Sequence, residues 1–190
     1  MKKPALLIID MQNDFVLEGK PLQVRGAAEI IPRIRAVLEY FRSRSCPVFH
    51  VVRIHRADGS DVEIIRQDLF KTTPFAVEGT HGAAVIDEIT PIPGEYILPK
   101  IRMSAFIGTG LDLTLRTLEV TTLVIVGIQT PNCIRTTAFD GIAYNYPVCL
   151  VDDATAAQTE DIHLANVQDM ANIGIQILKT GEICSLWSEG

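Results

Sequence analysis

Short apolar runs alternate with longer amphipathic segments along most of the chain. The runs have the length and composition of buried strands, as Ala5–Ile9 illustrates. Between them, apolar residues recur three or four positions apart, which is the spacing of a helix that covers one face of a sheet. The pattern predicts strands at Ala5–Ile9, Pro47–Val52, Tyr96–Leu98, Thr122–Val126, Val148–Val151 and Ile175–Leu178, and helices at Ala27–Arg44, Leu111–Leu118, Pro131–Tyr144 and Asp161–Asn172.

This alternation is typical of β-α units arranged around a mainly parallel sheet, here of about six strands. A length of 190 residues fits one domain, and a content of 47% apolar residues is enough for a sizeable core. The sequence therefore predicts an α/β fold with a single domain over residues 1–190.

The charge and the hydropathy narrow the classes of partner. A net charge of −6 argues against nucleic acid, because binding phosphates requires a basic face. No apolar stretch approaches the roughly 20 residues that span a bilayer. The apolar run after Met1-Lys2-Lys3-Pro4 stops at Asp10, and no cleavage site follows it. We expect a soluble cytoplasmic protein with free thiols that binds neither nucleic acid nor membrane.

The stretch from Arg53 to Pro93 shows no clear period and is the longest segment without a predicted element. Long excursions of this kind in a compact α/β domain are often functional loops. We expect this segment to form a lid over a site or a contact between subunits.

Three chemically reactive residues lie where predicted strands end. Asp10 follows the first strand, Lys100 follows the third, and Cys133 opens the helix after the fourth. Ligand sites of parallel sheets lie at the carboxyl ends of the strands. The three side chains are therefore expected at the same edge of the sheet.

Cys133 is the strongest candidate for a nucleophile among four cysteines. Thr130 is a suitable N-cap, which places Cys133 in the first turn of a helix. There the unpaired N–H groups and the helix dipole favour a thiolate, lower its pKa and offer donors for an oxyanion. The structural alternative is a buried, inert thiol, and it is the interpretation we favour for Cys46, Cys149 and Cys184.

Asp10 and Lys100 complete a plausible catalytic group. Asp10 has the chemistry of a general base that takes the thiol proton, and Lys100 would stabilise both the carboxylate and the thiolate. Taken singly, Asp10 is equally explained as the cap of a loop, and Lys100 as a solvated surface lysine. Their common position at one edge of the sheet favours a functional role.

The chain resembles the isochorismatase-like hydrolases, also called nicotinamidase-related cysteine hydrolases, over almost its whole length. Four motifs occur in order and carry the resemblance. They are Asp10-Met11-Gln12-Asn13-Asp14-Phe15, Gly79-Thr80-His81-Gly82-Ala83, Lys100-Ile101-Arg102-Met103-Ser104-Ala105-Phe106, and Gly127-Ile128-Gln129-Thr130-Pro131-Asn132-Cys133-Ile134.

The resemblance implies a three-layer α/β/α sandwich with a Rossmann-like sheet and a catalytic triad of Asp10, Lys100 and Cys133. It also implies a cis peptide between Ile128 and Gln129, with the N–H groups of Gln129 and Cys133 directed at an oxyanion. A homodimer or a larger homo-oligomer is implied as well. The implied reaction is cleavage of a C–N bond in a small molecule through a thioester on Cys133.

Departures from the family pattern bear on the metal and the substrate. Nicotinamidases carry a D-x-H metal motif and a later histidine, but here the first stretch is Arg53-Ile54-His55 and the later one is Lys71-Thr72-Thr73-Pro74-Phe75. Only His55 remains of three ligands, so we predict no metal and no other cofactor. An amide, carbamoyl or ureido substrate is favoured, with nicotinamidase or isochorismatase activity as the alternative.

A further set of residues is predicted to contact the substrate. Arg53 and His55 follow the second strand, and a guanidinium binds a planar anion such as a carboxylate through two hydrogen bonds. A solvated, ion-paired loop is the equal alternative for these two residues. Apolar walls are expected from residues that would otherwise belong to the core, namely Phe15, Phe106, Ile128 and Ile134.

Three other functions were weighed. A thiol sensor would need a resolving cysteine near Cys133 in the sequence, and there is none. A nucleotide-binding module would need a Gly-x-Gly-x-x-Gly turn after the first strand, and Asp10-Met11-Gln12 stands there instead. A catalytically inactive scaffold is disfavoured because all three triad residue types are retained.

Overall fold

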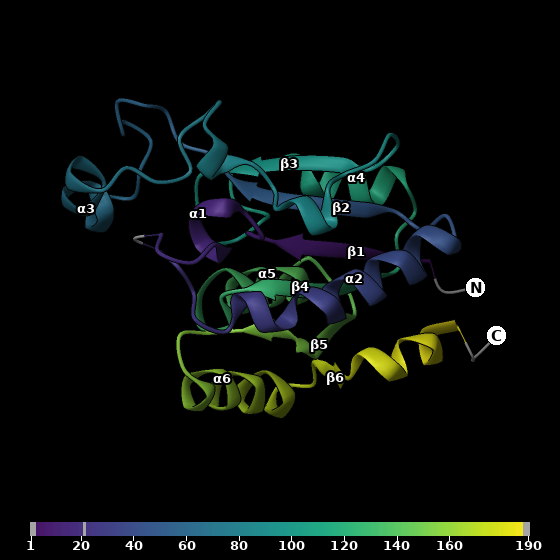
Figure 1. Ribbon diagram of the computed structural model, residues 1–190. Helices are drawn as coiled ribbons and strands as arrows, with labels where there is room; N and C mark the ends of the chain where they lie inside the picture. Colours follow the sequence, from purple (N-terminus) through teal and green to yellow (C-terminus); the bar gives the residue numbers. More distant parts are fainter. Residues whose placement is uncertain (1–2, 21, 188–190) are drawn as a thin grey trace.

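A parallel sheet forms the centre of the molecule, as the computed structural model shows for residues 3–20 and 22–187 (Figure 1). Within these residues the sheet has six strands in the order β3-β2-β1-β4-β5-β6, and every paired neighbour is parallel. This confirms the predicted α/β class and the three-layer arrangement. The strands are β1 (Pro4–Ile9), β2 (Val48–Arg53), β3 (Tyr96–Lys100), β4 (Thr122–Ile128), β5 (Val148–Ala156) and β6 (Gln176–Leu178).

Both faces of the sheet are covered, because successive side chains of a strand point to opposite faces. On β1, Leu6 and Ile8 pack in one core cluster, whereas Leu7 and Ile9 pack in the other. Helix α2 buries its apolar stripe in the first cluster, and α4, α5 and α6 contribute to the second. The α-helices are α1 (Asn13–Val16), α2 (Ala27–Ser43), α3 (Gln67–Thr72), α4 (Leu111–Thr117), α5 (Arg135–Ala143) and α6 (Glu160–Asn172). The 3-10 helices are η1 (Ile64–Arg66), η2 (His81–Ala83), η3 (Asp87–Ile89) and η5 (Thr180–Trp187), and η4 (Thr130–Ile134) is a π-helical turn.

Strand β5 and the Arg53–Pro93 segment differ from the predicted pattern. Strand β5 continues to Ala156, five residues beyond the predicted end at Val151, and its register against β4 shifts between Ile125 and Gly127. Asp152 and Asp153 interrupt the apolar run there, so the hydrophobic pattern could not reveal the continuation. The Arg53–Pro93 segment folds into short turns and α3, which projects from the body of the molecule (Figure 1).

No helix in the described part of the chain is long and apolar enough to cross a membrane.

The strand order of the sheet marks a position where a ligand site is expected. The strand order runs in opposite directions on either side of the β1–β4 pair, and ligands of doubly wound sheets bind at the carboxyl ends of the strands at such a point. The candidate site lies there.

Candidate active site

The β1–β4 pair brings two chain segments unusually close. Asp10 directly follows β1 and has a positive φ of 53°. Gly127, near the end of β4, has φ 109°, and a Cβ built there would lie 2.2 Å from the carbonyl oxygen of Ile9. Only glycine fits this approach. The close contact places the turn after β4 beside Asp10.

The turn after β4 carries the nucleophile candidate. The peptide bond between Ile128 and Gln129 is cis. The next residues form a π-helical turn, in which the N–H of Ile134 donates to the carbonyl of Gln129, five residues earlier, at 3.2 Å. The predicted N-cap at Thr130 is therefore wrong, since the cap position is Gln129 and the regular helix α5 begins only at Arg135.

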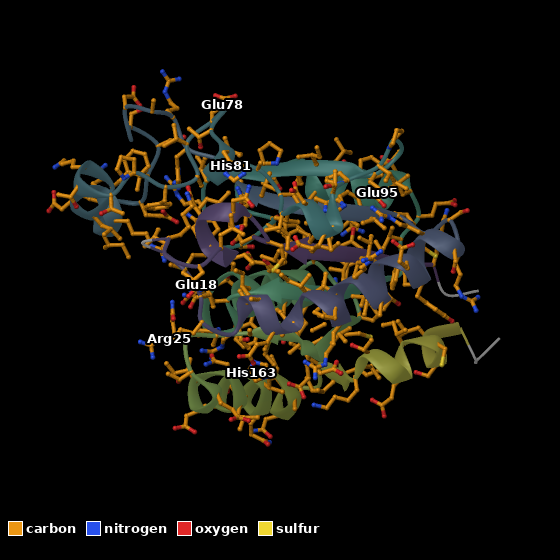
Figure 2. All side chains as sticks on the ribbon, in the orientation of Figure 1. Glu18, Arg25, Glu78, His81, Glu95 and His163 are labelled. Atoms are coloured by element: carbon orange, nitrogen blue, oxygen red, sulfur yellow. The ribbon has the colours of Figure 1, made fainter. Side chains whose placement is uncertain are left out.

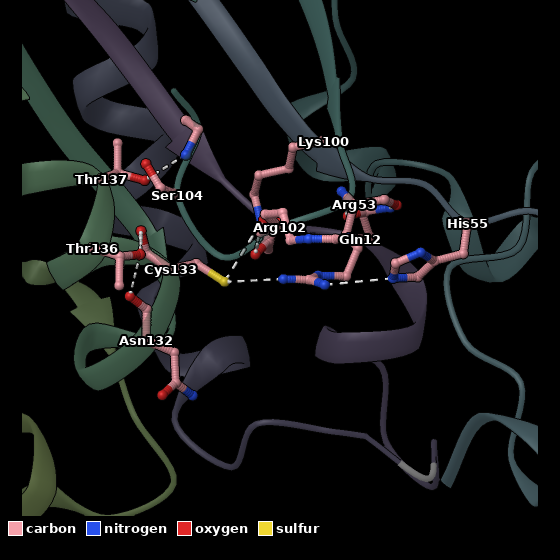
Figure 3. Close-up of polar contacts among 12 residues, drawn as sticks. Gln12, Arg53, His55, Lys100, Arg102, Ser104, Asn132, Cys133, Thr136 and Thr137 are labelled. Atoms are coloured by element: carbon pink, nitrogen blue, oxygen red, sulfur yellow. Dashed lines mark hydrogen bonds and ion pairs between the residues drawn. The ribbon is translucent and has the colours of Figure 1, made fainter. Parts of the chain in front are cut away.

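The structure brings Asp10, Lys100 and Cys133 together, and Figure 3 shows Lys100 beside Cys133. Lys100 Nζ donates to Asp10 Oδ2 at 2.9 Å and lies 3.5 Å from Cys133 Sγ. The lysine is 2% exposed, Asp10 5% and Cys133 7%, so water is largely excluded from the group. The second carboxylate oxygen, Asp10 Oδ1, is buried and has no hydrogen-bond partner among the described residues. It is available to accept a proton.

Burial changes the expected state of the thiol. We predicted a lowered pKa from the helix start, but burial, and next the charge of Asp10, raise the pKa of Cys133. Lys100 and Arg53 act in the opposite direction and offset part of this effect. Near neutral pH the sulfur is therefore a thiol that needs a base during attack.

Arg53 occupies the other side of the sulfur (Figure 3). It ends β2, is 1% exposed, and its Nη2 lies 3.8 Å from Cys133 Sγ. Its Nη1 donates to both oxygens of Glu63, at 2.8 and 3.0 Å. Burial opposes the charge on Arg53, but Asp10, Cys133 and Glu63 together raise its pKa, so the guanidinium stays charged. The alternative of a solvated, ion-paired loop is wrong in its solvation, because Arg53 is buried in β2, although the ion pair is present.

His55 does not reach the pocket. It is fully buried, its Nε2 lies 3.4 Å from Arg53 Nη1, and its Nδ1 lies 3.2 Å from Asp61 Oδ1. Its ring meets Phe70 and Phe75 edge-on. Burial, followed by the charge of Arg53, lowers the pKa of His55, so the ring is neutral. His55 acts as a support behind Arg53.

Gln12 links this support to the opening motif of the chain. Its Nε2 donates to the carbonyls of Arg53 and Ala83, at 2.8 and 2.7 Å, and its Oε1 accepts from the N–H of Arg53 at 2.7 Å. Gln12 is fully buried, so these bonds fix the backbone at the end of β2. Its place in the D-x-Q motif was the only sequence signal of this role.

A small pocket opens beside the sulfur. Phe15, Arg53 and Ile128, which we expected to contact the substrate, line it together with Asp10, Gln129 and Cys133. Phe106 stacks on Tyr144 instead, at 5.0 Å between ring centroids, and Ile134 is fully buried in the same core cluster, so neither lines the pocket. The sequence did not single out three other residues that line it, namely Val24, Arg66 and Asn132.

The donor set does not fit the metal centre that nicotinamidases carry. A guanidinium stands at position 53, and His55 already contacts it and Asp61. In residues 3–20 and 22–187, no group of three or more histidine, cysteine, aspartate or glutamate residues is placed to hold a metal ion. No step of the chemistry below is assigned to a metal.

Comparisons with known proteins agree with the motifs. The model of the isochorismatase domain matches residues 4–182. An Arabidopsis thaliana protein described as a probable inactive nicotinamidase is 44% identical, over 99% of this chain and 96% of its own. The maleamate amidohydrolase of Pseudomonas putida is 31% identical, over 89% of this chain and 79% of its own.

The solved structures point the same way. The crystal structure of an isochorismatase family protein from Desulfovibrio vulgaris superimposes with a TM-score of 0.96 and 43% identity, over the whole of both chains. The match of the family model, the shared fold and the ordered motifs lead to one conclusion: this chain belongs to the isochorismatase family, among the cysteine hydrolases related to nicotinamidases.

Proposed function

We propose that this protein is a cysteine amidohydrolase that cleaves a C–N bond of a small amide, carbamoyl or ureido compound. Asp10 takes the proton of the Cys133 thiol, and the sulfur forms a bond to the carbonyl carbon. The N–H groups of Gln129 and Cys133 stabilise the oxyanion. When the C–N bond breaks, Asp10 returns the proton to the departing amine, and water then hydrolyses the thioester and restores the thiol.

One observation supports this proposal above the others. Lys100 Nζ lies 2.9 Å from the carboxylate of Asp10 and 3.5 Å from the sulfur of Cys133, and all three residues are buried. The cation holds the carboxylate in place and stabilises the thiolate as it forms. An inert thiol would not require a buried ion pair beside it, because the desolvation of two charges is costly.

Arg66 adds a clue about the substrate. Its side chain lines the pocket and, within the described part of the chain, makes no ion pair. Arg53 differs, because Glu63 already neutralises it and its remaining face is turned to Cys133. We therefore assign the carboxylate of a substrate to Arg66 rather than to Arg53, in line with the carboxylate that maleamate carries beside its amide.

The test is ammonia release from a panel of compounds. The panel contains maleamate, a short N-carbamoyl amino acid, a ureido acid, uncharged esters of these acids, and nicotinamide. We expect hydrolysis of the acids, weaker hydrolysis of the esters, and little turnover of nicotinamide. Cys133→Ala should abolish activity, whereas Cys149→Ala, which removes another buried thiol, should retain it.

Two results would contradict the proposal. One is full activity in Cys133→Ala. The other is the absence of hydrolysis across the panel in a folded wild-type protein, which would favour the inactive scaffold that the description of the Arabidopsis relative suggests.

A further inference from the structure

A second polar network lies behind the turn that carries Cys133. Thr130, the first residue of this turn, is fully buried, and its Oγ1 lies 2.9 Å from His163 Nδ1. His163, labelled in Figure 2, belongs to α6, which packs against the turn. Its Nε2 lies 2.7 Å from Asp152 Oδ1. None of these three residues lines the pocket beside Cys133.

The charge on Asp152 fixes which nitrogen of His163 donates to the carboxylate. Burial acts to raise the pKa of Asp152, but Lys179 and His163 outweigh it and lower the pKa, so the carboxylate is ionised. An ionised carboxylate only accepts, so His163 Nε2 donates to it. In the neutral ring Nδ1 is then an acceptor, and it receives the hydroxyl of Thr130. Asp152 thus selects the tautomer that holds the threonine.

Asp152 is itself held firmly. Its Oδ2 accepts from Lys179, which follows β6, and its backbone carbonyl accepts from the Thr155 hydroxyl at 2.9 Å. The network therefore runs from the β5–β6 edge through α6 to the residue that opens the nucleophile turn. Asp152 of β5, Lys179 after β6 and His163 of α6 thus form one network behind the buried hydroxyl of Thr130.

We propose that His163, oriented by Asp152, is a positioning residue that holds Thr130 and thereby keeps Cys133 at its distance from Lys100. The sulfur lies three residues beyond Thr130 in the same turn. This turn has π-helical rather than α-helical hydrogen bonds, so its shape depends on support from outside. The inference deepens the proposed function, because it concerns the same nucleophile.

The test measures the electrostatic coupling between Lys100 and Cys133 without any substrate. Iodoacetamide alkylates thiolates, and peptide mass spectrometry reports the rate at Cys133 separately from the other three cysteines. Lys100→Met should slow this alkylation roughly tenfold in the wild-type background, because a neighbouring cation favours the thiolate. If Thr130→Val or His163→Ala releases the turn, the same Lys100→Met change should alter the rate less than about threefold.

Matched variants separate positioning from general loosening of the fold. Thr130→Ser keeps the hydroxyl and should keep the wild-type coupling. His50→Gln is a second control, because His50 is also a buried histidine beside a carboxylate, with its Nε2 2.8 Å from Glu95. This variant should also keep the wild-type coupling. His163 is on a partly exposed helix face, so its variant provides the result if Thr130→Val does not fold.

The proposal is overturned if the Lys100→Met effect is the same, within a factor of about two, in the wild-type, Thr130→Val and His163→Ala backgrounds. It is also overturned if His50→Gln or Thr130→Ser reduces the coupling as much as Thr130→Val does. Because alkylation needs no hydrolysis, either result stands whether or not the protein cleaves amides.

Discussion

Cys133 has a buried cation on each of two sides, and the two sides are built differently. On one side Lys100 pairs with Asp10, and both residues come from the ends of strands in the central sheet. On the other side Arg53 pairs with Glu63, which belongs to the loop before η1. The side chains of Lys100 and Asp10 are 0% and 6% exposed, whereas that of Glu63 is 13% exposed.

The difference between the two ion pairs suggests different roles: the Lys100–Asp10 pair for the proposed chemistry, and the Arg53–Glu63 pair for binding the substrate. Asp10 Oδ1 is buried and has no hydrogen-bond partner among the described residues, so we assign the proposed proton transfer to the Lys100 side. Both oxygens of Glu63 are engaged by Arg53, so the Arg53 side supplies a fixed charge and closes the pocket. The same segment brings Arg66, which lines the pocket, helps to lower the pKa of Glu63 and makes no ion pair within the described residues.

The largest expected effect is on hydrolysis. Asp10→Asn removes the proposed base and should lower kcat about 10³-fold, and Lys100→Met should do the same, since proton transfer typically contributes 10²–10⁴-fold. Glu63→Gln leaves the reacting groups in place and should cost about tenfold or less. Steady-state ammonia release measures all three. Equal losses in the three variants would remove the distinction between the two sides.

Alkylation of Cys133 should respond with opposite signs on the Lys100 side. Asp10 raises the pKa of Cys133, whereas Lys100 lowers it. Asp10→Asn should therefore speed alkylation by iodoacetamide near neutral pH, and Lys100→Met should slow it, each roughly tenfold. Arg53→Met should slow it less than Lys100→Met. Rates that change in the same direction for Asp10→Asn and Lys100→Met would contradict this charge balance.

Stability should distinguish the two ion pairs. Lys100→Met leaves Asp10 buried without a counter-charge and should lower the free energy of unfolding by about 3–5 kcal/mol. Arg53→Met leaves Glu63, which can turn towards water, so a loss of about 1–2 kcal/mol is expected. Urea unfolding measures both. The double variant Asp10→Asn/Lys100→Met should be more stable than Lys100→Met, and the account fails here if it is not.

Substrate affinity should depend on Arg66. Arg66→Met should raise KM for an acidic substrate about tenfold or more, because a charge-assisted hydrogen bond is worth about 1.5–3 kcal/mol. The KM for an uncharged ester should stay the same. Arg56→Met is the matched control, since Arg56 lies in the same segment, its side chain is 69% exposed and it does not line the pocket. An unchanged KM for the acid would exclude Arg66 as the anchor.

The smallest expected effect is on the pH dependence of the free energy of unfolding, through His55, which lies behind Arg53. Burial and then Arg53 lower the pKa of His55, so as the pH falls the unfolded chain binds the proton first. The contribution of neutral His55 is complete above about pH 6.5 and declines below it. His55→Gln should make the unfolding free energy fall less steeply between pH 7 and 5. An unchanged slope would show that His55 is not held neutral.

The strand ends were the most predictable part of the site. Asp10 and Lys100 follow runs whose apolar character alone marks them as strands, and the edge rule of parallel sheets then brings them together. The ordered family motifs pointed to the same residues and to Cys133. Local sequence sufficed because strand and edge are both short-range consequences of hydrophobic pattern.

The other features of the candidate site depend on tertiary contacts, which no local sequence pattern encodes. Glu63 and Arg66 lie in a segment without periodicity, and their places follow from the ion pair of Glu63 with Arg53 and from the lining of the pocket by Arg66. The pKa of Cys133 was predicted from its position in a helix, but desolvation by the whole fold reverses the direction. Thr130 and His163 are 33 residues apart, so their hydrogen bond was invisible in the sequence.

The most direct test of the central claim is to trap the acyl-enzyme. Rapid acid quenching after mixing with maleamate or a ureido acid, followed by peptide mass spectrometry, locates any covalent adduct. The account predicts the mass of the acyl group, without its amine, on the peptide that contains Cys133, and no adduct in Cys133→Ala. An adduct on another residue, or continued hydrolysis in Cys133→Ala, would contradict it.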